Sequence, residues 1–76
     1  MKKSEIKIGH IYSNNKSGLM REEREIIDEW YTYCEKKTEY VKYKIVYTNG
    51  AVGERESFSF TILKKSFAQW AKEDVT

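Results

Sequence analysis

The chain is poor in the residues that carry catalysis, metal binding and charge-driven recognition. Its 76 residues include one cysteine, one histidine and no proline, and its net charge at pH 7 is +2. One cysteine cannot form a disulfide within the chain, which fits a reducing compartment. One histidine and one cysteine among scattered carboxylates lack the spacing of a metal site. The small net charge excludes both a polybasic tail and an acidic mimic of nucleic acid.

Motifs for chemistry are also missing. The sequence has no glycine-rich phosphate loop, nucleophile elbow or zinc-binding motif. His10 has no recognisable nucleophile or metal partner, so we interpret it as a structural or surface histidine. We interpret Cys34 as a small packing residue rather than a reactive thiol. The sequence therefore predicts a protein that is not an enzyme and that has no cofactor, no metal and no small-molecule substrate.

No long hydrophobic run is present. No stretch approaches the roughly 20 apolar residues that cross a bilayer. The segment Met1–Gly9 lacks the continuous apolar region of a signal peptide. We therefore expect a cytoplasmic protein with no membrane partner.

What the chain has in abundance is aromatic and β-forming residues. Six Tyr, three Phe and two Trp supply large apolar groups to 76 residues. A chain of this length buries only about 60–65% of its unfolded surface, so its core is thin. We expect a single domain that spans residues 1–76.

Two alternating segments around an Asn-Gly step form the clearest structural signal. Residues 40–47 interleave β-branched and aromatic side chains with polar ones, and residues 57–62 alternate strictly. Asn49-Gly50 lies between them, and such a step between alternating segments is a strong hairpin signal. The sequence predicts two paired strands here.

The predicted turn also fixes a register. If the Asn-Gly step is the centre of a type I′ turn, Thr48 lies opposite Ala51 and Val41 lies opposite Phe58. The apolar rows of the two strands then share one face of the sheet. Gly53 would mark a bulge or a longer loop beyond the turn.

The flanking segments carry weaker signals. Alternation predicts a first strand at Glu5–Tyr12, and a cluster of turn formers predicts a loop at Ser13–Gly18. Charged and polar residues predict a second loop at Glu35–Glu39. A capping box, Ser66 to Gln69, predicts a short helix at about Phe67–Lys72 whose aromatic residues plug one end of the sheet.

The segment Leu19–Cys34 has two interpretations. As a helix it places an apolar stripe on one face, formed by Met20, Ile26, Ile27, Trp30 and Cys34. As a strand, residues 25–34 are rich in β formers toward their end. Periodicity alone slightly favours the helix, so the residues by themselves leave both interpretations open.

Short phrases along the chain resemble a known family. The phrases are Lys7-Ile8-Gly9-His10-Ile11-Tyr12 before an Asn-Asn loop, Arg24-Glu25-Ile26-Ile27, Tyr40-Val41-Lys42-Tyr43, and Leu63-Lys64-Lys65-Ser66-Phe67 with Trp70. Together they resemble the small SH3-like barrel proteins of bacteriophages and mobile elements. The resemblance implies a mostly β fold, namely a small SH3-like barrel of about five strands with a short C-terminal helix. It favours a strand at Leu19–Cys34 and carries no single activity.

Seven residues are candidates for contact with a partner. They are Trp30, Tyr31 and Tyr33 in a first group, and Tyr40, Lys42, Lys44 and Arg55 in a second. A thin domain cannot bury both faces of the first group, and exposed Trp and Tyr often anchor protein interfaces. The second group lies on the hairpin face opposite the core, where aromatic and basic side chains can bind nucleic acid. The plainer interpretation is that the aromatics close the barrel and the lysines solubilise it.

These observations lead to a hypothesis of function. We expect a non-catalytic protein, encoded by a phage or mobile element, that acts in the host cytoplasm. It would bind and block a host protein that the sequence does not identify, such as a component of a defence system. The alternative is a module that binds nucleic acid, with affinity that falls steeply as salt rises. A third interpretation is an assembly subunit that oligomerises through an edge strand.

Overall fold

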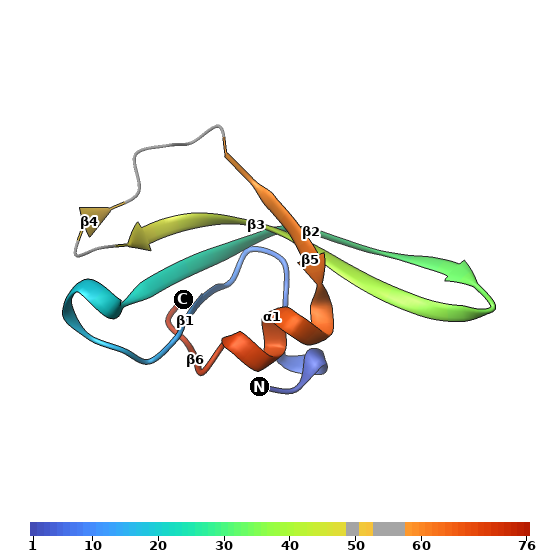
Figure 1. The fold of residues 1–76 in the computed structure, drawn as a ribbon, viewed down its shortest axis with the longest axis horizontal. Coiled ribbons are helices and arrows are strands. Elements are labelled where there is room, and N and C mark those ends of the chain that lie inside the picture. Colours follow the sequence, from blue (N-terminus) through green and yellow to red (C-terminus); the bar gives the residue numbers. More distant parts are fainter. Residues whose placement is uncertain (49–50, 53–57) are drawn as a thin grey trace.

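The chain folds into a mostly β structure around one antiparallel sheet (Figure 1). The computed structural model describes residues 1–48, 51–52 and 58–76. In chain order the elements of this part are η1 (Lys3–Glu5), β1 (Ile11–Ser13), η2 (Gly18–Met20), β2 (Glu22–Cys34), β3 (Lys36–Thr48), β4 (Ala51–Val52), β5 (Phe60–Leu63), α1 (Lys64–Trp70) and β6 (Glu73–Asp74). None of the helices in the described ranges is long and apolar enough to cross a membrane.

The sheet is open at both edges, so the predicted SH3-like barrel is not confirmed. Its strand order is β4-β3-β2-β1-β6, and β5 pairs with β3 beside β4. Among the described residues, no strand pairs β6 with β4 or β5 to close the sheet. Helix α1 contacts β3, β5 and η1. Together α1 and η1 cover one face of the open sheet, and the core lies beneath them.

A small aromatic core lies between α1, η1 and the middle of the sheet. Its buried residues are Ile6, Tyr12, Ile26, Val41, Tyr43, Phe67, Ala68 and Ala71. Phe67 of α1 is fully buried, and its ring centroid lies 5.7 Å from that of Tyr12 and 5.5 Å from that of Tyr43. Trp70 packs on Phe67 from the same helix, with centroids 5.4 Å apart. The aromatic residues of the predicted helix do pack on the sheet, but they cover its middle rather than plugging one end as predicted.

The predicted hairpin forms, and its pairing nearest the turn is as expected. Thr48 lies opposite Ala51. The turn type at Asn49-Gly50 and the bulge predicted at Gly53 lie outside the described residues.

Farther from the turn, the predicted register is wrong. Val41 lies opposite Ile62 rather than Phe58, so the pairing with β5 is displaced by four residues. An even displacement keeps every side chain on its predicted face. Phe60 is therefore on the predicted face but now lies opposite Tyr43, with ring centroids 5.4 Å apart. Phe58 lies before the strand and is exposed.

The strand predicted at Glu5–Tyr12 is wrong except at its end. Ile6 enters the core from the η1 segment, and β1 begins only at Ile11. A turn interrupts the alternation, because Gly9 adopts φ +85° and the His10 N–H donates to the Lys7 carbonyl at 3.2 Å. Glycine occupies that left-handed region at little cost. The turn reverses the chain where simple alternation predicted extension.

The other predicted boundaries need smaller corrections. The stretch that could be helix or strand is a strand from Glu22, as the resemblance predicted. The loop predicted at Glu35–Glu39 is wrong, since β3 begins at Lys36 and continues the pairing with β2. Helix α1 begins at Lys64, with Leu63 as its N-cap and no side-chain capping bond, so the Ser66–Gln69 capping box is also wrong.

The end of the described chain is held by polar contacts with β1. Strand β6 pairs with β1, and His10 Nδ1 lies 2.7 Å from Asp74 Oδ2. The Thr76 hydroxyl donates to Asp74 Oδ1 at 2.5 Å. This hydrogen bond is the main cause that lowers the pKa of Asp74 from its ordinary 3.8 to about 2, and the contact with His10 lowers it as well. The interpretation of His10 as a structural residue agrees with this contact.

We expect part of the stability to disappear in acid because of Asp74. A carboxyl group with a lowered folded-state pKa stabilises the fold above its ordinary pKa, and this contribution is lost as the pH falls from about 4 to about 2. The free energy of unfolding, measured with urea, should therefore fall more steeply over this range in the wild type than in Asp74→Asn. Equal slopes in the two proteins would show that Asp74 does not contribute.

Candidate functional site

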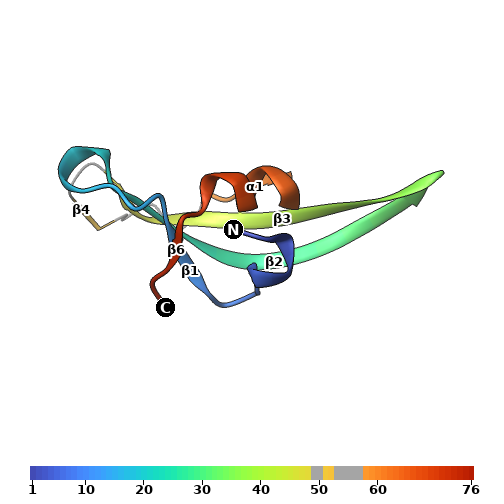
Figure 2. The ribbon, with the colours of Figure 1, turned by 90° about the horizontal axis from the view of Figure 1, so that it is seen from below.

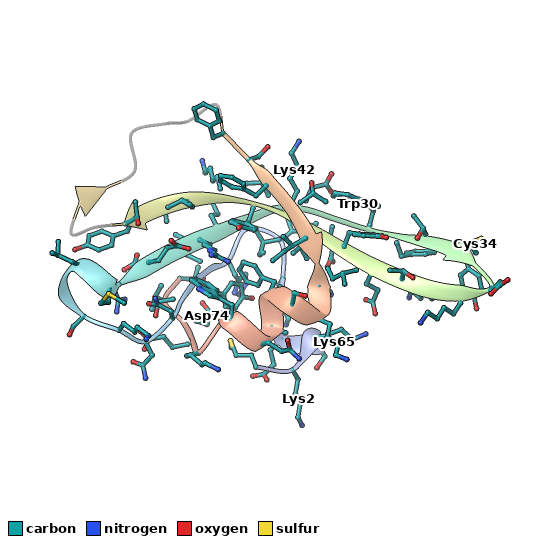
Figure 3. All side chains as sticks on the ribbon, in the orientation of Figure 1. Lys2, Trp30, Cys34, Lys42, Lys65 and Asp74 are labelled. Atoms are coloured by element: carbon teal, nitrogen blue, oxygen red, sulfur yellow. The ribbon has the colours of Figure 1, made fainter. Side chains whose placement is uncertain are left out.

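The β2–β3 hairpin continues past the core as a projecting arm (Figure 1 and Figure 2). Each strand has 13 residues, and the protein measures 42 × 25 × 17 Å along its principal axes. We define the arm as residues 28–39, with Glu35 at its tip. Figure 3 shows Cys34 at the far end of this arm, away from α1. The arm is the part of the described fold that stands farthest from the core.

Local sequence explains why the arm is extended. Trp30, Tyr31, Thr32 and Tyr33 are β-forming residues that fit a pleated strand. Glu35 adopts φ +69°, a left-handed conformation that lets the chain reverse within a very short turn. The pairing between β2 and β3 then runs without a further shift from the bulge near Ile27 to the tip.

The core-side face of the arm carries exposed tyrosines. This face consists of Glu29, Tyr31 and Tyr33 of β2, opposite Val41, Glu39 and Lys37 of β3. Val41 is fully buried in the core, whereas Tyr31 is 60% and Tyr33 75% exposed. The Lys37 ammonium lies 4.6 Å from the centroid of the Tyr31 ring, a cation–π contact. The apolar face of the sheet therefore continues beyond the point where the helix covers it.

A cluster of four charged residues joins the base of the arm to the core. Lys64 Nζ lies 2.9 Å from a Glu29 oxygen and 3.9 Å from a Glu39 oxygen, and its side chain is only 12% exposed. Lys3 Nζ donates to the other Glu39 oxygen at 3.0 Å. The hydrogen bond from Lys3 is the main cause that lowers the pKa of Glu39 below its ordinary value. This cluster links the base of the arm to η1 through Lys3 and to α1 through Lys64.

An open groove lies beside this cluster. It has a volume of about 470 Å³ and is lined by Glu29, Trp30, Tyr31, Lys37, Glu39 and Lys64. Two carboxylates and two ammonium groups line it, so their formal charges cancel. The groove is continuous with the exposed ring of Tyr31, which makes it a recess in one larger contact surface.

The outer face of the hairpin combines aromatic rings with compensated charges. Trp30 and Tyr40 stack with ring centroids 6.0 Å apart and planes 19° apart. Lys42 projects on the side away from α1 (Figure 3) and lies opposite Asp28 in the strand register. Lys44 Nζ lies 3.5 Å from a Glu25 carboxylate oxygen. Each of these two lysines therefore has a carboxylate beside it.

The structure places six of the seven predicted contact residues on this hairpin. Trp30, Tyr31 and Tyr33 are on the arm, Tyr40 is at its base, and Lys42 and Lys44 follow on the outer face. Arg55 lies outside the described residues. The two predicted groups meet where Trp30 stacks on Tyr40.

Sequence reasoning missed the charged residues of the site. Glu39 and Lys37 were assigned to a loop, although their alternation with Tyr40 and Thr38 is that of a strand. Lys3 and Lys64 gave no signal, because they reach Glu39 only through the packing of η1 and α1.

Two of the chemical interpretations can be compared with the structure. The interpretation of Cys34 as a packing residue is wrong, because its side chain is exposed at the arm. Within the described ranges, no group of three or more His, Cys, Asp and Glu side chains could hold a metal ion. Cys34, the single cysteine of the sequence, is thus exposed near the tip of the arm.

Comparisons with known proteins do not identify a relative. No family model, curated protein or solved structure matches the chain. The resemblance to SH3-like phage proteins stays a prediction, and the function is argued from the geometry of the arm.

Proposed function

We propose that this chain is a non-catalytic binding protein that binds another protein through its arm. The observation that carries this proposal is the exposure of Tyr31 and Tyr33 on a projecting hairpin whose base is joined to α1 by the Lys64–Glu29 ion pair. Tyr and Trp supply large contact areas with few rotatable bonds, and such residues dominate the binding energy of protein interfaces. The groove beside Tyr31 offers a recess for a side chain of the partner.

The charge of the arm favours a protein over a nucleic acid. Residues 28–39 contain four acidic and two basic side chains, which sum to 2 − 4 = −2. Nucleic-acid binding requires neutralisation of phosphates by lysine and arginine, so a negative arm opposes it. A protein surface with mixed charges is a better match for alternating Glu and Lys around tyrosines.

We further propose that the partner is a protein of a host cell. The chain would come from a phage or mobile element and would block a host protein, such as a component of a defence system, in the cytoplasm. The short phrases that resemble SH3-like phage proteins support this form of the proposal.

We expect alanine substitution of both tyrosines to weaken partner capture at least about tenfold. The double variant Tyr31→Ala, Tyr33→Ala removes the two most exposed rings of the arm and leaves the core intact. Affinity for a partner captured by the wild type and measured by titration should fall at least about tenfold, because interface Tyr residues often contribute 2 kcal/mol or more. Circular dichroism should show an unchanged fold.

The matched control lies at the opposite end of the molecule. Leu19 and Met20, which are 74% and 66% exposed, belong to η2, far from the arm (Figure 1). Leu19→Ala, Met20→Ala removes a comparable exposed apolar area and should retain the partner. If wild type, arm variant and control capture the same proteins with the same affinity, the arm is not the binding site.

Nucleic-acid binding is the second candidate, and one observation favours it. Tyr40, Lys42 and Lys44 share the outer face of β3, with Trp30 stacked at one end. Binding through this face should weaken as salt rises, and Lys42→Ala should weaken it further. Electrophoretic shifts at low salt measure this. An absence of any shift with single- and double-stranded probes excludes the candidate.

A further inference from the structure

One long edge of the sheet is left without a partner. The outer edge of β2 pairs with β1 as far as Glu25, and backbone bonds with Gly9 and His10 extend this to Ile26. From Asp28 to Cys34, no residue in the described part of the chain pairs with that edge. Figures 1 and 2 show the arm standing clear of the other described elements. The open edge is seven residues long.

Apart from the bulge at Ile27 and the carboxylates of Asp28 and Glu29, this edge lacks the features that normally prevent strand pairing. Protein edges are usually protected by lysine, proline, a bulge or a very short strand. The sequence from Asp28 to Cys34 contains no lysine, proline or glycine. Its bulge lies before Asp28, at Ile27, where the open edge begins. By contrast, the other edge of the arm, on β3, carries Lys36 and Lys37.

We propose that the open edge of β2 pairs antiparallel with the same edge of a second copy of this chain. Symmetry limits the register, because a two-fold axis normal to the sheet pairs residues whose numbers sum to an even value. Centring the axis on Tyr31 pairs all seven residues from Asp28 to Cys34 with all seven of the second copy. The two sheets then become one continuous sheet with β2 strands at its centre.

Charge complementarity supports a second copy as the occupant. In this register Asp28 lies opposite Cys34 of the second copy, and Lys36 lies next to that cysteine in β3. Because a cysteine side chain is small, Lys36 of the second copy can reach past it to the carboxylate of Asp28 in the first copy. On the other face Glu29 lies opposite Tyr33 of the second copy, beside its Lys37. Asp28 and Glu29 of each copy therefore lie near Lys36 and Lys37 of the other copy, and this happens twice by symmetry.

Pairing changes one existing hydrogen bond at the edge. The Glu29 N–H donates to the Asp28 carboxylate at 2.8 Å, outside the β2–β3 ladder. That N–H faces the open edge and would bond instead to a backbone carbonyl of the second copy. The carboxylate of Asp28 then no longer accepts from this N–H, and it can form an ion pair with Lys36 of the second copy. The pairing uses the edge of the arm and leaves the exposed tyrosine rings on its face, so it does not depend on the proposed function.

The single cysteine provides a direct test in the native sequence. Cys34 is exposed and can carry a nitroxide label. Pulsed electron paramagnetic resonance then measures the distance between the two labelled arm tips. With the axis at Tyr31, the two labelled positions are six residues apart along the sheet, or about 20 Å. A distribution centred near this distance supports the register. The absence of any dipolar interaction across the soluble concentration range overturns the proposal.

Two matched substitutions test the register without a label. Tyr31→Lys places two lysines directly opposite each other on the axis, and like charges there destabilise pairing. Thr32→Lys adds the same positive charge one residue away, where it lies opposite Thr38 in its own hairpin and opposite Trp30 of the second copy. Sedimentation equilibrium of the purified protein should show association weakened up to about fivefold by Tyr31→Lys and retained by Thr32→Lys. Equal loss in both variants contradicts the register, and a monomeric wild type contradicts the pairing itself.

These results separate the two proposals. Association is measured on the purified chain alone, whereas partner capture is measured against other proteins. A wild type that stays monomeric but captures a partner through the arm would overturn only the edge pairing. Retained association without arm-dependent capture would overturn only the proposed function.

Discussion

Replacing Phe67 with alanine should cause the largest loss of stability among the substitutions considered for this protein. The side chain is fully buried and contacts the rings of Tyr12, Tyr43 and Trp70. Loss of a buried Phe ring costs about 3–5 kcal/mol, because the cavity left behind relaxes only partly. At about 0.05–0.15 kcal/mol per residue, a chain of 76 residues has about 4–11 kcal/mol of stability in total. One substitution therefore removes between about a quarter of this stability and all of it.

Urea unfolding followed by near-ultraviolet circular dichroism measures this effect. Leu19→Ala is the control, since Leu19 is 74% exposed and its loss should change the free energy of unfolding by no more than about 0.5 kcal/mol. If Phe67→Ala changes the free energy of unfolding as little as Leu19→Ala does, the packing of α1 on the sheet does not stabilise the core. The arm pairing alone would then have to hold the fold.

Removing one oxygen atom from Tyr12 should have the second-largest effect. The ring is fully buried, and its hydroxyl donates to the Glu5 carbonyl at 2.7 Å and accepts from the Lys7 N–H at 2.8 Å. Tyr12→Phe leaves both backbone groups without this partner, which costs about 1–3 kcal/mol where water cannot replace it. Chemical denaturation at neutral pH should show this loss.

The effect of Tyr12→Phe should also depend on pH. Burial raises the pKa of the Tyr12 hydroxyl above its ordinary value of 10.0. The folded state keeps this proton at a pH where the unfolded chain loses it, so the stability that Tyr12 provides declines as the pH rises above about 10. The difference between wild type and Tyr12→Phe should therefore narrow in alkali. A constant difference at every pH would mean that the hydroxyl titrates as it does in the unfolded chain.

How far the sequence predicted the fold is clearest in β2 and β3. Alternating β-branched and aromatic residues correctly indicated the strand that holds Val41 and Tyr43, and the Asn-Gly step correctly placed Thr48 opposite Ala51. Residues 35–39 were misjudged as a loop because they are charged and polar. Pairing with β2 extends them, since the backbone hydrogen bonds of a ladder do not depend on the polarity of the side chains.

The candidate site divides in the same way. Trp30, Tyr31 and Tyr33 could be named from the sequence, because a thin domain cannot bury a dense aromatic run on both faces. The base of the arm could not, because Lys3, Glu39 and Lys64 are separated by 36 and 25 residues and meet only after η1 and α1 have packed. The open edge of β2 was equally hidden, since an edge is defined by which strands are absent beside it.

The sequence by itself determined the local geometry: β-rich strands, a two-residue link after Thr48 and a short aromatic helix near the end of the chain. Only the tertiary structure decided that the sheet stays open and that β2 and β3 run on together as an arm. The physical reason is the range of the forces involved. Side-chain shape and backbone preference act between neighbours in the chain, whereas the position of an edge or an ion pair depends on every segment that packs against it.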